Sequence, residues 1–313
     1  MHSFEGDVTI LHNKRVLGHI LALITICLWG FAYVAIVTLL RSFTPVEIMF
    51  FRIGLATIVL FIIYPRRMGK LSLKQELYFM AAGAAGVTAY FLLQDFALTH
   101  TAAPNVSIII AVSPVIVGLL SWWFLKSGCP KWTFFLGAVL ALLGIGVVRF
   151  AGQQLEIHPL GDFLAMLAAV AWAAYSVLLK KIDAFGYHSI QVIRRVFLYG
   201  LIFLIPFILF SDFQLGLERF AEPINLASLL YLALGASAGG FVFWNWSLKQ
   251  LGPVKVSAYV YLHPLIAVAA AVVFLGDQIT WLFAGGLVLV LAGLMLSNRK
   301  TRAKSHDSEE AVQ

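Results

Sequence analysis

Two stretches of the chain decide its fold. Residues 18–37 read GHILALITICLWGFAYVAIV, and residues 161–180 read GDFLAMLAAVAWAAYSVLLK. Each is apolar over about the 20 residues that a helix needs to cross a bilayer. Each also begins with a glycine and carries a tryptophan eleven residues later. The two stretches therefore predict a pair of related membrane-spanning helices, one in each half of the chain.

The composition of the whole chain also indicates a membrane protein. Of its 313 residues, 61% are hydrophobic and 12% are charged, and the mean hydropathy is +0.91. A soluble globular protein carries about 25% charged residues and has too little interior for this much apolar side chain. Two cysteines are too few for a disulfide framework. These values exclude soluble, disordered and disulfide-rich folds.

Ten apolar segments are long enough to span a bilayer, and short polar linkers separate them. The segments are residues 17–40, 46–65, 76–98, 104–125, 132–150, 161–181, 190–210, 226–248, 256–275 and 281–297. No linker has room for a separate soluble domain. We therefore expect an all-α polytopic membrane protein with polar, flexible tails at residues 1–16 and 298–313.

The basic residues predict how the spans are oriented. If the N-terminus is cytoplasmic, 16 of the 22 Lys and Arg residues lie in cytoplasmic segments. Three lie on the opposite side, namely Arg41, Arg149 and Arg219, and three lie within spans. This excess follows the positive-inside rule. Because ten spans is an even number, both termini are expected in the cytoplasm. The membrane is expected to be the cell inner membrane.

The second half of the chain repeats the first. A shift of 143 residues places Trp29 on Trp172 and Arg52 on Arg195. Shifts of 149 and 150 match further pairs, namely Phe91 with Phe241, Ser107 with Ser257, Pro114 with Pro264, Gly137 with Gly286, and Gly144 with Gly293. Residues 17–150 and 161–297 thus hold five spans each. Five is odd, so the halves enter the membrane from opposite sides, which is a common plan of secondary transporters.

These motifs resemble a known family. Trp29-Gly30-Phe31, Pro45 followed by Arg52, the two mid-span prolines, and the glycines 285, 286 and 293 resemble the EamA-type ten-helix members of the drug/metabolite transporter superfamily. The chain departs from them at Lys126-Ser127 and Gly276-Asp277, where the family often has Gly-Glu. The resemblance implies a central cavity enclosed by spans one to four and six to nine, with spans five and ten peripheral. It also implies export of amino acids or related compounds.

Polar and aromatic side chains within the spans are the candidates for solute binding, because aromatic rings stack on flat solutes and buried polar groups orient them. The predicted substrate-binding residues are Trp29, Tyr90, Gln94, Ser107, Trp172, Tyr175, Asn245, Tyr259 and His263. His263 could hydrogen-bond the solute or take a proton. The alternative is that these side chains only pack, with His263 bonded to a neighbouring helix.

Three charged residues, Arg52, Asp95 and Arg195, are predicted to serve gating or charge pairing. Inserting an arginine into a bilayer costs about 2.5–3.5 kcal/mol on insertion scales, so an arginine within a span is expected to have a structural or functional role. Arg52 and Arg195 could attract an anionic group of the solute, but their shared repeat position leads us to favour a structural role. Asp95 could pair with Arg52, gate the outer mouth or accept a proton. Alternatively, it is an interfacial residue in contact with water.

Pro114 and Pro264 are predicted to act as paired hinges beside the central site. Each removes a backbone hydrogen bond in the middle of its span, and such freed groups are tolerated only against protein or a wet cavity. The alternative is that both are inherited kinks without a function in transport.

Other function classes lack their motifs in this sequence. The sequence has no P-loop, which ATP-driven transport would need, and no His-Glu-x-x-His, which would indicate an intramembrane metalloprotease. No polar ring or filter indicates a channel. We expect a secondary transporter, not an enzyme, with no cofactor or metal, whose partners are a small-molecule solute and membrane lipid rather than nucleic acid. Import or exchange of another metabolite class is the alternative, and the solute, the coupling ion and the oligomeric state stay open.

Overall fold

The computed structural model describes residues 2–101, 103–126, 128–150, 158–263, 265–266 and 281–297, and these residues form helices and connecting turns without a strand. The first half contains α1 (His2–Leu39), α2 (Pro45–Ile63), α3 (Leu73–Gly83), η1 (Ala84–Ala89), α4 (Tyr90–His100), α5 (Ala103–Ile110), α6 (Ser113–Leu125) and α7 (Trp132–Phe150). The second half contains α8 (Pro159–Asp183), α9 (Ser189–Phe210), η2 (Leu217–Ala221), α10 (Pro223–Leu230), η3 (Tyr231–Gly239), α11 (Gly240–Leu251), α12 (Pro253–Ser257), η4 (Ala258–Leu262) and α14 (Trp281–Ser297).

Seven helical segments within the described residues are long and apolar enough to cross a membrane. They occupy the predicted spans one to four and six to eight, so the all-α polytopic prediction is confirmed. Shorter apolar helices, Trp132–Val147 and Gly285–Ser297, lie at the predicted spans five and ten. Of span nine, the structure describes residues 256–263 and 265–266 only. Pro264 and the tail 298–313 lie outside the described residues.

Helix starts near the predicted boundaries have local causes. Thr44 accepts a hydrogen bond from the backbone N–H of Glu47, and the Glu47 carboxylate accepts one from the N–H of Thr44. Ser72 and Gln75 form the same reciprocal box at the start of α3. These contacts satisfy N–H groups that a helix start otherwise leaves free. Both capping boxes therefore fix where α2 and α3 begin.

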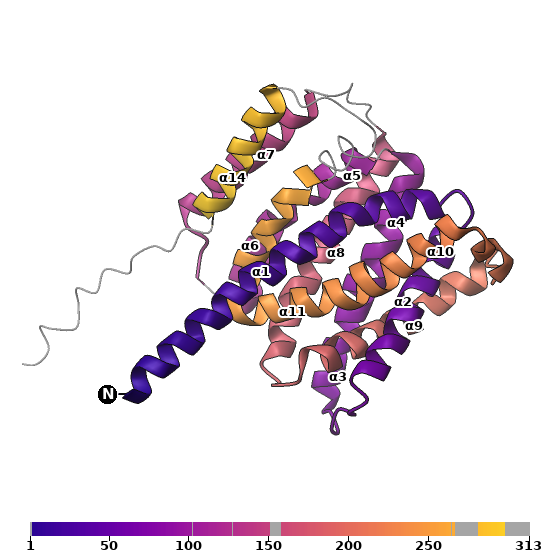
Figure 1. Cartoon of the computed structure of the whole chain (residues 1–313), viewed down its shortest axis with the longest axis horizontal. Coiled ribbons are helices and arrows are strands. Elements are labelled where there is room, and N and C mark those ends of the chain that lie inside the picture. Colours follow the sequence, from indigo (N-terminus) through magenta and orange to yellow (C-terminus); the bar gives the residue numbers. More distant parts are fainter. Residues whose placement is uncertain are drawn as a thin grey trace, which may run out of the picture.

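The N-terminal segment differs from its prediction. We expected residues 1–16 to be a flexible tail, but α1 already begins at His2. Adding residues to an existing helix is far easier than starting one, and no proline interrupts residues 2–16. The helix of span one therefore extends beyond its apolar stretch. Figure 1 shows this extension protruding from the bundle.

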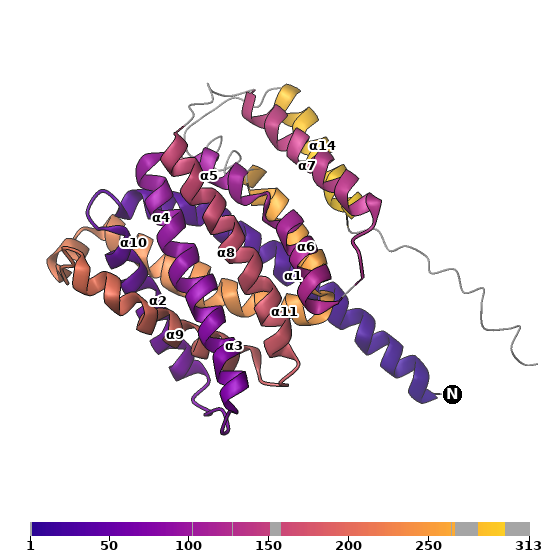
Figure 2. The same ribbon diagram turned by 180° about the vertical axis from the view of Figure 1, so that it is seen from behind.

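The helices α7 and α14 form an antiparallel pair at the edge of the bundle (Figures 1 and 2). A Cβ on Gly137 would lie 2.6 Å from the Gly293 carbonyl oxygen, and one on Gly144 would lie 2.7 Å from that of Gly286. The sequence repeat equates Gly137 with Gly286 and Gly144 with Gly293. Each contact is therefore the repeat image of the other, which is the pattern that a twofold axis between antiparallel halves produces. The small residues also let the two backbones approach closely.

The spans of the central bundle are interrupted at matching places. The π-helical segments η1 and η3 lie in spans three and eight at overlapping repeat positions. Span four is broken between α5 and α6, directly before Pro114, as the proline predicts. The helices α1 and α8, which the repeat equates, run in opposite directions (Figure 2). The interruptions place irregular backbone within the spans of both halves. The opposite directions of α1 and α8 agree with an inverted repeat.

Candidate functional site: an enclosed aromatic cavity

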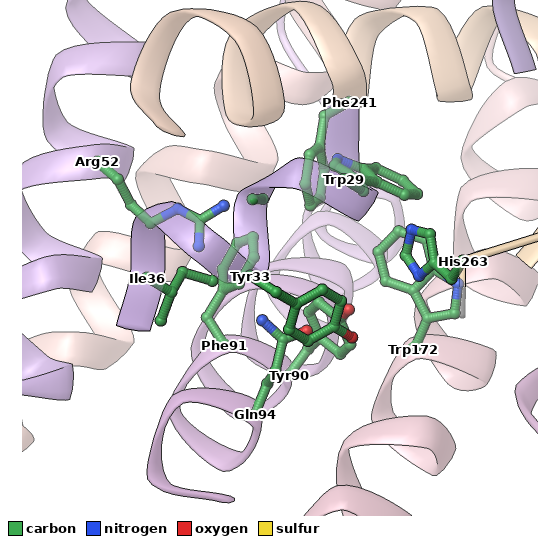
Figure 3. Close-up of a pocket in the computed structure, with 11 residues that line it drawn as sticks. Trp29, Tyr33, Ile36, Arg52, Tyr90, Phe91, Gln94, Trp172, Phe241 and His263 are labelled. Carbon is green, nitrogen blue, oxygen red and sulfur yellow. The ribbon is translucent and has the colours of Figure 1, made fainter. Parts of the chain in front are cut away.

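A cavity lies where α1, α2 and α8 meet the starts of α4 and α11 and His263 of span nine (Figure 3). Its volume is about 20 Å³, which is room for about one water molecule, so the lining side chains nearly fill the cavity in this conformation. Eleven residues line it, namely Trp29, Ala32, Tyr33, Ile36, Arg52, Tyr90, Phe91, Gln94, Trp172, Phe241 and His263. The lining is mostly aromatic with a few polar groups, which is the usual composition of a site for a small organic molecule.

Two pairs of lining residues show that the cavity lies on the pseudo-twofold axis. The rings of Trp29 and Trp172 have centroids 5.0 Å apart and meet edge to face. Those of Phe91 and Phe241 are 5.6 Å apart. Each pair joins a residue to its own repeat equivalent, which is possible only close to the axis. Both repeats therefore contribute to one cavity, and neither forms it alone.

The π-helical segment η3 holds Trp29 in place. The indole Nε1 of Trp29 donates to the carbonyl oxygen of Ala236 at 2.8 Å. A π-helical turn is wider than an α-helical one and is frequent at functional sites. The Trp29 ring also contacts Phe241 and Trp244, with centroids 5.5 and 5.0 Å away. These contacts fix the indole plane at the wall of the cavity.

The cavity is symmetric in outline but not in chemistry. Tyr90 lies 4.9 Å from Trp172, centroid to centroid. The repeat equivalent of Tyr90 is Gly240, where a Cβ would lie only 2.8 Å from Nε1 of Trp29. The tyrosine hydroxyl therefore exists on one side of the axis only. A solute bound here meets two different faces.

Arg52 is the charged residue of the cavity wall. Its side chain comes from α2 and is 2% exposed. Nε donates to the hydroxyl of Ser237 at 3.1 Å, and the guanidinium carbon lies 4.1 Å from the centre of the Phe91 ring. Nη1 is buried and has no hydrogen-bond partner. Figure 3 shows the guanidinium pointing into the cavity.

Arg195, the repeat equivalent of Arg52, has a different environment. It forms a salt bridge with Glu76 at the start of α3, and the Tyr199 hydroxyl donates to the same carboxylate. The Arg195 side chain is partly exposed and does not line the cavity. The repeat gives Arg52 and Arg195 the same position and the same predicted role. In the structure they have different surroundings, because Arg52 lies at the centre of the molecule and Arg195 at its end.

Asp95 and Gln94 lie side by side on α4. Asp95 is 0% exposed, so it does not contact interfacial water as one interpretation of the sequence held. Its Oδ1 accepts a hydrogen bond from Gln94 Nε2 at 3.4 Å, and its Oδ2 has no partner. Among the described residues no salt bridge joins Asp95 to Arg52. Gln94 lines the cavity, whereas Asp95 lies behind the lining.

His263 forms the end of the cavity opposite Arg52 (Figure 3). Its ring centroid lies 6.1 Å from that of Trp29 and 6.0 Å from that of Tyr33. The side chain is buried, yet neither ring nitrogen has a hydrogen-bond partner, and the Tyr33 hydroxyl has none either. Buried polar groups are normally bonded to protein, water or ligand. These atoms are therefore available to a molecule in the cavity.

The predicted site residues divide into two groups. Trp29, Tyr90, Gln94, Trp172 and His263 line the cavity, and Arg52 lines it as well. The remaining predicted binding residues, Ser107, Tyr175, Asn245 and Tyr259, do not line it. Tyr259 instead hydrogen-bonds His19 at 2.6 Å, near the start of span one. Five of the nine predicted binding residues thus lie at the cavity, and the other four lie away from it on α5, α8, α11 and η4.

Sequence reasoning missed five lining residues, namely Ala32, Tyr33, Ile36, Phe91 and Phe241. Tyr33 and Ile36 follow Trp29 by four and seven residues, so they share its helix face. Phe91 and Phe241 were matched by the repeat but were not offered as site residues. Both patterns could have pointed to the cavity.

Side-chain contacts tie the two repeats together at both ends of the bundle. At the end where α2 begins, the Arg219 guanidinium pairs with Glu47 at 3.0 Å, and Gln214 N–H donates to the same carboxylate at 2.9 Å. At the opposite end, Arg194 donates to the carbonyl oxygens of Tyr64 at 2.6 Å and Arg66 at 2.8 Å. Each of the paired helices α2 and α9 thus holds the loop that follows the other. Contacts between the repeats therefore lie at both ends of this helix pair.

Comparison with known proteins identifies the family. The model of the EamA-like transporter family matches residues 16–150 and, a second time, residues 159–299. The chain belongs to this family. An "uncharacterized transporter" of Archaeoglobus fulgidus is 31% identical over 92% of this chain and 98% of its own length. A crystal structure with 20% identity covers 90% of this chain and 97% of its own, with a TM-score of 0.71, which supports the fold.

Two further relatives of this EamA-like transporter carry functional names. A "probable terminal-alkyne amino-acid exporter" of Streptantibioticus cattleyicolor is 31% identical over 72% of this chain and 74% of its own length. A "probable amino-acid metabolite efflux pump" of Salmonella typhimurium is 31% identical over 51% of this chain and 56% of its own length. The family makes this chain a multi-pass membrane transporter of a small-molecule solute, and not an enzyme. The described residues contain no group of three or more His, Cys, Asp or Glu that could hold a metal ion.

Proposed function

We propose that this EamA-like transporter exports an amphipathic metabolite, an amino acid or a related compound, across the inner membrane by alternating access. The observation that carries the proposal is the aromatic cavity on the axis that relates the two repeats, where Trp29 meets Trp172. A site on such an axis is presented in the same way to both sides when the two halves exchange conformations.

In this proposal, residues 17–150 and 161–297 are the two moving units, and the ends 1–16 and 298–313 lie in the cytoplasm. The excess of Lys and Arg on one side supports this orientation. The contacts between repeats at both ends support a state in which the cavity is closed to both sides. Opening toward either side then requires the contacts between repeats at that end to break, namely those of Arg219 with Glu47 at one end and those of Arg194 with the loop after α2 at the other.

The nature of the solute is supported by the cavity and by the relatives. An aromatic wall with a few polar groups suits a molecule with an apolar body and a polar head. The names of the Streptantibioticus and Salmonella relatives refer to amino acids and export. Import, or exchange of another metabolite class, is the alternative.

Counterflow in proteoliposomes tests the carrier mechanism. Vesicles loaded with an unlabelled amino acid should accumulate the labelled form transiently and saturably, whereas protein-free vesicles should not. A channel would show flux without counterflow. If no member of a panel of amino acids and related metabolites shows counterflow, the proposed solute class is wrong.

A growth assay tests the direction. Cells that overproduce the protein should tolerate higher concentrations of toxic amino-acid analogues, because an exporter lowers their internal concentration. Greater sensitivity in the same cells would show import instead. Cells that overproduce the His263→Phe variant, for which we expect several-fold slower transport, should show a correspondingly smaller change in tolerance.

A further inference from the structure

A line of titratable side chains leads from one end of the bundle to the cavity on the axis and to the acid behind it. We infer that these side chains form a proton path, and that protons moving inward along it drive the export of the solute. The residues of the path are His19, Tyr259, His263, Tyr33 and Asp95. This inference rests on the proposed function for the transport itself, and it adds what drives that transport.

The path begins at the end of the bundle that is expected in the cytoplasm. His19 is half-buried near the start of the apolar part of α1, and its Nδ1 lies 2.6 Å from the hydroxyl oxygen of Tyr259 in η4. Lys255, four residues before Tyr259, lies close enough for its charge to act on His19. A hydroxyl that is hydrogen-bonded to an imidazole can pass a proton to it. This contact therefore connects span nine with the water at the end of the bundle.

His263 continues the path into the cavity (Figure 3). It follows Tyr259 by four residues, which is about 8 Å at the rise of a 3-10 helix. Both of its ring nitrogens are buried and have no partner among the described residues, and the same holds for the Tyr33 hydroxyl. The ring centroids of His263 and Tyr33 are 6.0 Å apart, beside a cavity with room for about one water molecule. A water molecule bonded to both would carry a proton between them.

Asp95 is the acid at the far end of the path. The charged and titratable groups that face it are Arg52 from α2, Tyr33 from α1 and Tyr90 from α4, and Arg52 attracts it. The carboxylate is fully buried. It accepts one long hydrogen bond, of 3.4 Å from Gln94 to Oδ1, and Oδ2 has no partner among the described residues.

Glu47 shows the surroundings of a buried carboxylate that has a structural role. Its side chain is 1% exposed, and it accepts hydrogen bonds from the N–H groups of Thr44 and Gln214 and from the guanidinium of Arg219. Asp95 is buried as deeply but has far fewer such bonds. A carboxylate in this state can take up a proton readily, because few bonds to its charged form are lost.

Arg52 makes the proton load of Asp95 depend on the conformation of the protein. A cation beside a carboxylate stabilises its charge, whereas a carboxylate that loses this neighbour in a low-dielectric site takes up a proton. Arg52 lies on α2 and Asp95 on α4, so a movement of α2 against α4 changes the distance between the two charges. Opening and closing of the outer half of the bundle then loads and unloads Asp95.

Each passage moves one proton and leaves every residue of the path as it was. A proton from the outer side binds an oxygen of the Asp95 carboxylate and passes through the Tyr33 hydroxyl and the water to a ring nitrogen of His263. The Tyr259 hydroxyl receives it while giving its own proton to His19, which releases one to the cytoplasm. The step from His263 to Tyr259 needs a rotation of the imidazole ring or a second water. No bond between heavier atoms forms or breaks.

The path extends over most of the thickness of a bilayer. Tyr33 follows His19 by 14 residues on α1, which is about 21 Å at helical rise. Asp95 lies five residues, or about 8 Å, before His100 at the exposed end of α4. The hydrocarbon core that a proton must cross is about 30 Å thick. Chains of histidine and acidic side chains within spans are typical of proton relays.

The repeat shows that the path belongs to one side of the axis. The positions equivalent to the five path residues contain no histidine and no tyrosine, and they hold Asp162, Ile109, Ser113, Ser176 and Asn245. Two copies of the path would be expected if these side chains only packed around a twofold axis. One path gives one route for protons through each molecule.

A pH gradient across proteoliposomes tests the coupling, with radiolabelled L-leucine and L-phenylalanine as solutes. The membrane potential is held at zero with potassium and valinomycin, and the lumen is made about one pH unit more acidic than the bath. The wild-type protein should accumulate at least one of the two amino acids about threefold or more, up to about tenfold, because one pH unit corresponds to a tenfold ratio per proton. At equal pH the solute should only equilibrate. Accumulation from an acidic bath instead would show symport and overturn the proposal.

Asp95→Asn separates proton binding from solute exchange. Counterflow at equal pH should persist, because exchange requires no net movement of protons, whereas the pH gradient should no longer produce accumulation. Asp162→Asn removes a carboxylate in the first turn of α8, outside the path, and should accumulate the solute as the wild type does. Accumulation at the wild-type level in Asp95→Asn overturns the proposal.

Tyr259→Phe keeps the test valid if Asp95→Asn fails to fold. It removes one hydroxyl and no charge, and it breaks the contact with His19. Accumulation should slow several-fold while counterflow at equal pH stays the same. Tyr261→Phe is the matched control, because the Tyr261 hydroxyl is buried, has no partner among the described residues and does not line the cavity. Equal rates of accumulation in both variants would contradict the path.

A measurement without solute distinguishes failure of this inference from failure of the proposed function. As the pH is lowered from neutral, the infrared spectrum of the purified protein should gain a carbonyl band of a protonated carboxylic acid that Asp95→Asn lacks and Asp162→Asn keeps. Identical spectra of the wild type and Asp95→Asn, or counterflow without accumulation in a pH gradient, would overturn the proton path and leave the carrier standing. The band without counterflow of either amino acid would support Asp95 as the proton site and contradict the proposed solute class.

Discussion

His263 combines nearly complete burial with two ring nitrogens that have no partner. A buried polar atom without a hydrogen bond costs about 1–3 kcal/mol, so a residue kept in this state is not explained by stability. The same holds for Nη1 of Arg52 and for the Tyr33 hydroxyl. These atoms all belong to residues that line one cavity. Other buried polar atoms without a partner, such as the Tyr175 and Tyr261 hydroxyls, lie away from the cavity, so what distinguishes these is that water or a solute in the cavity can reach them.

Replacing His263 by phenylalanine separates these two roles. The ring shape is kept and two unsatisfied nitrogens are removed, so the melting temperature in detergent should stay the same or rise. Counterflow should fall several-fold, because the solute loses its contacts with the nitrogens. His100→Phe, at the exposed end of α4, serves as the control and should change neither value. A lower melting temperature together with normal counterflow would show that His263 is structural.

Trp29→Phe tests the hydrogen bond to η3. The variant keeps an aromatic ring at the cavity wall but loses the donor to the Ala236 carbonyl oxygen. Leaving that oxygen unpaired should destabilise the protein by about 1–3 kcal/mol and impair counterflow without preventing membrane insertion. Trp123→Phe is the matched control, because Trp123 is 75% exposed. Unchanged stability and flux in Trp29→Phe would remove this hydrogen bond from the account of the site.

The repeat predicts which residues of the two halves correspond, but it does not predict which side chain each of them contacts. Arg52 faces Ser237, whose repeat equivalent is Val87, and Arg195 faces Glu76, whose equivalent is Leu226. The two arginines differ because their partners in the opposite half differ. One sequence without a structure shows that these partner positions have diverged. It does not show that they lie opposite the arginines, so the separate environments of Arg52 and Arg195 could not be predicted.

At the scale of helices, the sequence predicted where most of the membrane spans lie, but it predicted only some of the breaks within them. Apolar length alone located the long spans, because every backbone group in lipid must be bonded within its own helix. Pro114 predicted the break between α5 and α6, since proline removes a backbone donor. No comparable residue marks the π-helical segments η1 and η3. They follow from how the helices pack around the axis, and that packing depends on the whole bundle.

Pro114→Ala tests the break as a hinge. Restoring the backbone donor should let α5 and α6 join into a more continuous helix, with equal or slightly higher thermal stability. If the break serves transport, the rate of counterflow should fall several-fold while equilibrium binding of the solute changes less than about twofold. Pro206→Ala is the control, because Pro206 lies within α9 on an exposed face. Equal rates in the wild type and in both variants would show that the break is an inherited kink.

At the scale of the whole molecule, the twofold relation makes the two ends comparable. Glu47 and Arg219 tie the repeats at one end, and Glu76 and Arg195 tie them at the other. In each pair the carboxylate comes from the first half and the guanidinium from the second. A transporter that opens alternately must break one set of ties while it keeps the other. In the proposed alternating-access mechanism, the relative strength of the Glu47–Arg219 and Glu76–Arg195 contacts would therefore bias which side is open.

Neutralising one carboxylate at a time should shift this balance in opposite directions. Glu47→Gln should favour opening at the end where α2 begins, and Glu76→Gln should favour opening at the other end. Because the Glu47 side chain is almost fully buried and also accepts from Gln214, its loss should change the ratio of open to closed states about threefold or more, or about 0.7 kcal/mol. Glu76 is more exposed and should have a smaller effect.

Spin labels on exposed residues report the two openings separately. Labels at Arg41 and Glu218 span the first end, and labels at Lys70 and Ala184 span the second, in a background where both cysteines are replaced by serine. Glu47→Gln should lengthen the distances in the first pair and leave the second unchanged or shorter, and Glu76→Gln should do the reverse. If both variants lengthen the distances at both ends, the ties stabilise the fold as a whole. They then do not control which side of the cavity opens.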